Sequence, residues 1–208
     1  AMSTFGALSI EAGEVRFAAL TASANKCLEG VPGVGFAIIE TSALAAAEGN
    51  APSLSLDLHD QWRVMEDTGQ WRFTPPTHVV AALDQALAEH QAEGGIEARF
   101  ARYSRNCRVL VDGLRHIGFE TFLPDELQAP IIVTVRMPHD PNFAFERLYD
   151  LLHADGIVIY PGSVTAEPTF RIGCIGRIGE DDMKRTLAAI AAALKQMGIG
   201  EDGLAPAE

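Results

Sequence analysis

Apolar residues follow two spacings along this chain, and together these predict an alternation of strands and helices. Two short apolar runs, residues 17–22 and 34–39, are typical of buried strands. The loop between them consists of small residues and contains one lysine, Lys26. Farther along, apolar positions three or four residues apart predict an amphipathic helix over 54–66, with Leu54 and Met65 near its ends.

Two long helices are predicted in the middle of the chain. The motif TPPTH at 74–78 favours a helix start, because proline needs no N–H partner in a first turn, and this helix runs to Gly94 and Gly95. A second helix follows over 96–116 and stops near Gly118. Its four regularly spaced arginines are expected on a solvated face: Arg99, Arg102, Arg105 and Arg108.

The rest of the chain is predicted to alternate between strands and helices up to residue 197. The expected strands are 119–123, 131–137, 157–160 and 169–174, and the expected helices are 143–154 and 181–197.

The two halves of the chain differ in pattern, which predicts a mixed α/β protein with two domains. Residues 1–50 resemble the end of a mostly parallel α/β unit, whereas 95–200 resemble a small α+β domain. We therefore expect residues 1–76 in one domain, 77–94 as a linking helix, 95–200 as the second domain and 201–208 as a tail.

Composition narrows the possible functions. The chain has 208 residues with 48% hydrophobic and 21% charged residues, typical of a globular protein. A net charge of -12 without a basic run disfavours nucleic-acid binding, and the lack of an apolar run near eighteen residues disfavours a membrane span. Three scattered cysteines favour a reducing compartment, so a cytoplasmic location is expected.

Lys26 is the first candidate for chemistry. The simplest interpretation is a surface lysine in a loop, since lysine is rarely buried. The alternative is a nucleophilic amine that reacts with an aldehyde, which a partly desolvated pocket would favour. Glycines at positions 30, 33 and 35 would let a ligand approach the backbone closely.

Several motifs carry a resemblance that covers nearly the whole chain. The segment SANKCLEGVPGVGF at 23–36 resembles the active-site segment of the 2-aminoethylphosphonate:pyruvate transaminases, which are class V aminotransferases of the pyridoxal phosphate (PLP) fold type I. FRIGCIG at 170–176 supports the same group. SLSLDLHDQW at 53–62 and WRFTPPTH at 71–78 favour the phosphonate branch. AMSTFG, APIIVTV and GIVIYPG also match, in order and at compatible spacing.

The resemblance implies a fold and a chemistry. The chain would comprise the C-terminal part of the large α/β domain and the small α+β domain. Lys26 matches the lysine that binds PLP covalently and moves a proton during transamination. Arg171 matches the arginine that binds the substrate carboxylate, for which a planar guanidinium is suited; the alternative is an arginine exposed on a strand edge.

Four further residues are implied at the cofactor or the substrate. Thr74 matches a residue that reaches the cofactor phosphate of a partner subunit, which implies a homodimer with shared active sites; its alternative is a helix N-cap. Arg72 is expected near the same phosphate or the substrate phosphonate. Asn25 and Ser23 are placed to help bind the phosphate, although local bonding within the turn is the alternative.

No metal site is expected, because the histidines form no spaced set with cysteines or acids. They are His59, His78, His90, His116, His139 and His153.

The family pattern also includes features that this sequence does not show. An aspartate that pairs with the pyridine nitrogen precedes AMSTFG in the family, and this chain begins at Ala1. The expectation is therefore a C-terminal portion of such an enzyme that is inactive alone. Two alternatives remain: a class V aminotransferase acting on alanine, serine or glyoxylate, or a catalytically silent chain that only folds or self-associates.

Overall fold

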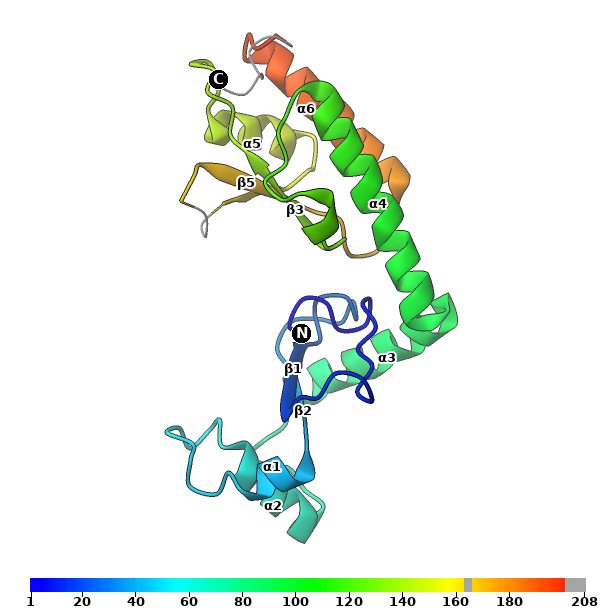
Figure 1. Ribbon diagram of the computed structural model, residues 1–208, viewed down its shortest axis with the longest axis vertical. Helices are drawn as coiled ribbons and strands as arrows, with labels where there is room; N and C mark the ends of the chain where they lie inside the picture. The colour runs from blue at the N-terminus through cyan, green and yellow to red at the C-terminus, as the bar shows by residue number, and fades with distance from the viewer. Residues whose placement is uncertain (163–165, 201–208) are drawn as a thin grey trace. The chain divides into compact units, whose positions relative to one another are not determined.

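A computed structural model of the chain describes residues 1–162 and 166–200 and divides it into two compact units, Ala1–Arg99 and Phe100–Glu208. The first unit contains β1 (Ala19–Ser23), β2 (Gly35–Ile39), α1 (Thr41–Ala45), α2 (Leu58–Thr68) and α3 (Thr77–Glu93). Helix α4 (Gly95–Ile117) begins in the first unit and continues into the second. The second unit adds η1 (Asp125–Leu127), β3 (Ile132–Arg136), α5 (Phe145–Ala154), β4 (Tyr160–Pro161), β5 (Thr169–Gly173) and α6 (Glu180–Gln196) (Figure 1).

The sheet of the first unit is an antiparallel pair. β1 and β2 pair from Ala19 opposite Ile39 to Ser23 opposite Gly35. The loop of residues 24–34 that joins them is shorter than the usual helical crossover between parallel strands, so the two strands run in opposite directions. Both predicted strands are present, although this pair itself is not parallel.

Helix α2 begins later than the apolar spacing predicts. Asp57 caps it by accepting a hydrogen bond of 3.0 Å from the backbone N–H of Asp60. Leu54 therefore lies outside the helix, and its side chain is 72% exposed. The expected start at residue 54 was wrong because a capping carboxylate, rather than the spacing of leucines, sets where this helix begins.

The junction of α3 and α4 depends on two glycines. Gly94 and Gly95 have φ values of 113° and 72°, in the left-handed region that favours glycine. Gly94 is the C-cap of α3, and α4 begins with the next residue. The predicted end of the first long helix is therefore confirmed, and the following helix needs no connecting loop.

The second unit is a three-stranded antiparallel sheet packed with helices. The strand order is β3-β5-β4, with Ile132 opposite Gly173 in the register of the central pair. Val133 and Val135 of β3 and Phe170 and Ile172 of β5 alternate with less buried residues, so each strand turns one face to the core. The same core cluster includes residues of α4, α5 and α6.

Two predicted strands of this unit pair over fewer residues than expected. Residues 119–123 make only one isolated bridge, Thr121 with Val135, because the chain enters a 3-10 turn directly after Pro124. Of the predicted strand 157–160, only Tyr160 pairs with β5. Within the described residues, no helix is long and apolar enough to cross a membrane.

Candidate active site

Lys26 lies on a tightly bonded turn between β1 and β2. Its backbone carbonyl accepts a 2.9 Å hydrogen bond from the N–H of Glu29, and the N–H of Gly30 donates to the carbonyl of Ala24 at 2.8 Å. Ala24, Cys27 and Leu28 are buried, whereas the side chain of Lys26 is exposed. The turn thus presents an accessible amine from a backbone that is fixed on both sides.

Glycine is required at one position of this turn by a close approach. A Cβ atom on Gly30 would lie 2.9 Å from the carbonyl oxygen of Ala24, which is a backbone atom and has little freedom to move. The small residues predicted to give a ligand access to the backbone therefore also have a structural role, at least at this position.

Cys27, the residue after Lys26, is a buried neutral thiol. Its Sγ donates a 3.1 Å hydrogen bond to the carbonyl oxygen of Ser3. Burial raises the pKa of this thiol to about 11, an effect that the nearby cation of Arg99 opposes and the carboxylate of Glu29 reinforces. The thiol therefore contributes to packing rather than acting as a nucleophile at neutral pH.

Ser23 and Asn25, the residues predicted to assist a phosphate, bind each other. The hydroxyl of Ser23 donates a hydrogen bond to the side-chain oxygen of Asn25. This is the local bonding that the sequence offered as an alternative. It keeps both polar groups beside Lys26, so a role at a phosphate stays a prediction.

Arg72 and Thr74 lie together before α3. Arg72 pairs with Asp60 at 3.0 Å and donates a 3.1 Å hydrogen bond to the carbonyl of Leu54. Thr74 is exposed and is not the N-cap of α3, because Pro76 occupies that position without a side-chain cap. Both residues line a surface hollow of ≈ 710 Å³, whose lining consists of residues 69–75.

Arg171 belongs to the second unit, in the middle of β5. Its Nε and Nη2 donate hydrogen bonds of 3.2 and 3.0 Å to the carbonyl oxygen of Pro161 in β4. The guanidinium is therefore oriented by the strand pairing, with Tyr160 opposite Arg171 in the register. A carboxylate that binds here would meet a cation whose direction is already set.

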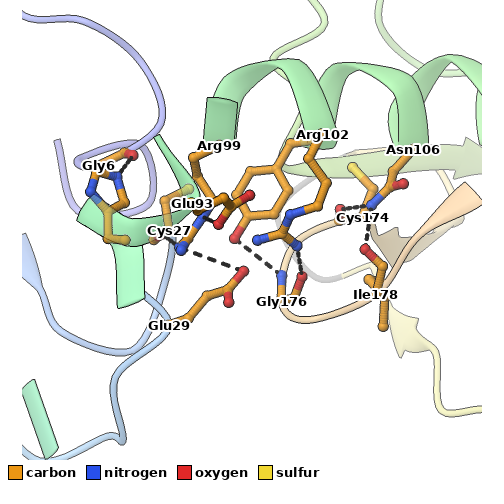
Figure 2. A network of polar contacts seen from close by, with 12 residues as sticks. Gly6, Cys27, Glu29, Glu93, Arg99, Arg102, Asn106, Cys174, Gly176 and Ile178 are labelled. Carbon is orange, nitrogen blue, oxygen red and sulfur yellow. Dashed lines mark hydrogen bonds and ion pairs between the residues drawn. The ribbon is translucent and has the colours of Figure 1, made fainter. Parts of the chain in front are cut away.

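The chain that follows β5 is held by three side chains of α4. Arg102 donates to the carbonyl of Gly176, and the hydroxyl of Tyr103 accepts a 3.3 Å hydrogen bond from the N–H of Gly176. Asn106 donates to the carbonyls of Cys174 and Ile178 at 3.2 and 3.0 Å. Figure 2 shows Arg102 and Asn106 directed toward this segment, which fixes the end of the strand that carries Arg171.

The sequence predicted that the four regularly spaced arginines of α4 lie on a solvated face, and for Arg99 this was wrong. Arg99 is buried and bonded within the first unit, and Arg102 is partly buried. Arg99 falls in one helical stripe with Tyr103, Leu110 and Leu114, all of which are buried. That spacing is the signal that could have placed Arg99 in the interior.

One group of possible metal ligands occurs among the described residues. The candidate ligand atoms of Asp57, His59 and Asp60 lie within 4.8 Å of one another. Both carboxylates already have protein partners, since Asp57 caps α2 and Asp60 pairs with Arg72. These contacts give the acids a structural role.

Comparison with known proteins gives close relatives by sequence. The chain is 55% identical over 199 residues to the 2-aminoethylphosphonate–pyruvate transaminase of Pseudomonas putida (strain GB-1), covering 96% of this chain and 54% of the relative. It is 54% identical over the same length to 2-aminoethylphosphonate–pyruvate transaminase 1 of Burkholderia lata. The chain thus spans about half the length of the curated relatives it matches. No protein-family model matches it.

Solved structures agree on the fold. The pyridoxamine-pyruvate aminotransferase of Mesorhizobium loti has a TM-score of 0.84 and 22% identity, covering 98% of this chain and 54% of its own. The ureidoglycine-glyoxylate aminotransferase of Bacillus subtilis has a TM-score of 0.81 and 23% identity, covering 96% and 52%. At these identities the likeness concerns the fold alone.

Fold and sequence together define the class: the chain has the architecture of the class V, fold-type I aminotransferases, over about half of their length. Within that class, and over the part that it spans, it is similar in sequence to the 2-aminoethylphosphonate–pyruvate transaminases, at 55% identity. The α/β fold class and the resemblance predicted from the sequence are confirmed.

Proposed function

We propose that this chain provides the lysine and the substrate-binding arginine of a PLP-dependent transaminase that converts 2-aminoethylphosphonate and pyruvate into phosphonoacetaldehyde and L-alanine. The observation that carries the proposal is the exposed amine of Lys26 on a turn with buried flanking residues, in a chain 55% identical to transaminases of that name. The same identity favours this activity over one with alanine, serine and glyoxylate.

The residues present suit a cofactor with an aldehyde and a phosphate. Lys26 offers an amine, and the N-terminus of α3, where the helix dipole favours an anion, follows Arg72 and Thr74 directly. When bound, PLP supplies a ring that withdraws electrons from the substrate carbon beside the amine. A related solved structure, the phosphoserine aminotransferase of Trichomonas vaginalis, has PLP bound.

Lys26 has two roles in this proposal. Its Nζ would hold the cofactor before substrate arrives. Once released, Nζ would accept a proton from the substrate carbon beside the amine and donate a proton to the cofactor carbon that had held it. The bonded turn supports this role because both transfers require Nζ to lie in the same place.

Arg171 binds the carboxylate of pyruvate and of alanine. The hydrogen bonds from Nε and Nη2 to the Pro161 carbonyl would hold the guanidinium while the substrate exchanges. Arg72, Thr74, Ser23 and Asn25 are proposed at the cofactor phosphate, with Arg72 alternatively at the substrate phosphonate.

We also propose the wider setting expected from the sequence. Residues 1–76 would belong to the large domain and 95–200 to the small one, with 77–94 linking them. A homodimer would bring Thr74 to the phosphate of the partner subunit. The three cysteines are buried free thiols, which supports a cytoplasmic location.

Labelling tests the role of Lys26 directly. The chain has three lysines, so incubation with PLP, reduction with borohydride and peptide mapping should place the label on Lys26 rather than on Lys184 or Lys195. Lys26→Ala should abolish it, while Lys184→Ala should not. Equal labelling of all three lysines would contradict the proposal.

A turnover assay tests the substrates. The chain should show little alanine formation alone, because it spans about half the length of its relatives. Co-expression with the part of the Pseudomonas putida relative that lies outside the match should restore turnover with 2-aminoethylphosphonate and pyruvate. Faster turnover of alanine or serine with glyoxylate would favour the alternative activity. A folded assembly that neither binds PLP nor turns over would indicate a silent chain.

A further inference from the structure

A buried arginine lies beneath the turn that carries Lys26. Arg99, near the start of α4, is only 2% exposed. An arginine is almost never fully buried unless it is paired, and its guanidinium stays charged at any physiological pH. The groups that surround it must therefore compensate a full positive charge.

Three contacts of Arg99 connect separate segments of the first unit. Its Nη1 donates a 2.5 Å hydrogen bond to the carbonyl oxygen of Cys27 and lies 3.5 Å from Oε1 of Glu29. Its Nε donates to Oε2 of Glu93, at the end of α3, at 2.7 Å. Figure 2 shows the guanidinium between these groups. We refer to Arg99, Glu29, Glu93 and the Cys27 carbonyl as the Arg99 cluster.

Two of these contacts act on the backbone next to Lys26. Cys27 is the following residue, and the N–H of Glu29 donates to the carbonyl of Lys26 itself. Glu29 also has a φ of 60°, the one positive φ found at a non-glycine among the described residues. A glutamate in this left-handed conformation is strained, so the surrounding contacts must hold it there.

Two further contacts involve residues near the N-terminus. Nε2 of His90 lies 2.6 Å from the carbonyl oxygen of Gly6, and Cys27 Sγ bonds the carbonyl of Ser3. These contacts hold the first residues of the chain against the turn. Arg99 adds an ion-paired contact that joins the turn to α3 and α4.

We infer that Arg99 is a positioning residue for Lys26: by binding the Cys27 carbonyl, Glu29 and Glu93 together, it fixes the backbone from which the Lys26 amine projects. The consequence for cofactor attachment rests on the proposed function. The effect on the turn does not, and it can be measured in the chain without cofactor.

The first experiment measures hydrogen exchange of the Glu29 and Gly30 amides, which donate to Lys26 and Ala24. In Arg99→Gln both amides should exchange on the order of tenfold faster or more, since a buried ion pair loses its cation. Arg105→Gln is the matched control, because Arg105 is an exposed arginine of the same helix. Unchanged exchange in Arg99→Gln would overturn the inference.

Conservative variants keep the test decisive if Arg99→Gln fails to fold. Glu29→Gln removes a single carboxylate and should speed exchange at positions 29 and 30 only. Arg99→Lys keeps the charge, but one ammonium cannot reproduce the fork of bonds, so exchange should fall between that of the native chain and Arg99→Gln. Native-like exchange in folded Glu29→Gln and Arg99→Lys would overturn the inference.

The second experiment uses PLP labelling of Lys26 at a fixed time, together with thermal unfolding. Folded Arg99→Gln should lose labelling about tenfold relative to Arg105→Gln, more than any difference in thermal midpoint explains, with partial rescue by Arg99→Lys. If the native chain is not labelled, the proposed function fails while the exchange result still stands. If it is labelled and Arg99→Gln is labelled equally, the positioning role fails.

Discussion

Lys26 and Cys27 are adjacent in the chain, yet their side chains occupy opposite environments. The amine is exposed, whereas the thiol is completely buried and bonded to Ser3. A turn that buries one neighbour and exposes the other fixes the direction of both. The Lys26 amine is therefore oriented by the residue beside it.

The buried thiol predicts a pH dependence of stability. An unfolded cysteine ionises near pH 9.0, and the folded one near 11, so between these values the unfolded state loses its proton first. The free energy of unfolding should then fall as pH rises, by up to about 3 kcal/mol, and the stabilisation is fully present below pH 9.0.

Cys27→Ser tests this dependence, because the serine hydroxyl can still donate to Ser3 but does not ionise in this range. Urea unfolding at the two pH limits should show a smaller decline for Cys27→Ser than for the native chain. The same decline in both proteins would show that another group is responsible.

At the scale of elements, the pairing of β4 with β5 depends on Gly162. A Cβ there would lie 2.0 Å from Thr169 Oγ1 and 2.5 Å from the Thr169 backbone oxygen, and backbone cannot move aside easily. Gly162→Ala should therefore cost about 2 kcal/mol and loosen the carbonyl of Pro161 that binds Arg171.

Gly173→Ala, in β5, is a suitable control because nothing lies within 4 Å of its added methyl group. Its stability in urea should stay within about 0.5 kcal/mol of the native chain. Equal losses for both variants would contradict the close approach at Gly162.

The elements also show where sequence reasoning succeeds. Long apolar periodicity placed α4 and α6, each of which buries several residues along one face. The TPPTH motif and the Gly94–Gly95 pair placed α3. Apolar periodicity misplaced the start of α2 because Leu54 fits the spacing but Asp57 caps the helix. It also missed Arg99, because a charge in the interior is explained by Glu93, at the end of the preceding helix, and by Glu29, which is distant in sequence.

In the candidate site too, some features could be predicted from the sequence and others could not. Motifs predicted Lys26 and Arg171 as candidate site residues, since each lies in a distinctive local segment, and their roles stay predictions. The partners that orient them, the carbonyls of Pro161 and of the turn around Lys26, are backbone atoms. Their positions depend on strand register and loop conformation, which side-chain patterns do not specify.

At the scale of the whole molecule, several large apolar side chains of the first unit are exposed. Leu54 and Leu56 are 72% and 76% exposed, and Trp71 and Phe73 follow in the same unit. Exposed apolar groups of this size are typical of surfaces that another chain or segment covers.

We therefore expect the chain alone to bind the dye ANS and to self-associate, as measured by fluorescence and light scattering. The double variant Leu54→Ser and Leu56→Ser should weaken both signals more than Leu127→Ser, which alters one exposed leucine of the second unit. Undiminished dye binding by the double variant would place the accessible apolar surface elsewhere.

Because Glu29 has a left-handed conformation, substitutions there can separate the cost of backbone strain from the attraction between its carboxylate and Arg99. Glycine at this position would relax the backbone and remove the carboxylate, whereas alanine would remove the carboxylate and keep the strain. The difference in stability between the two replacements should be about 1 kcal/mol in favour of glycine, and it measures the conformational cost alone. The native glutamate and the alanine form share that strain, so the difference in stability between these two measures the attraction of the carboxylate to the guanidinium.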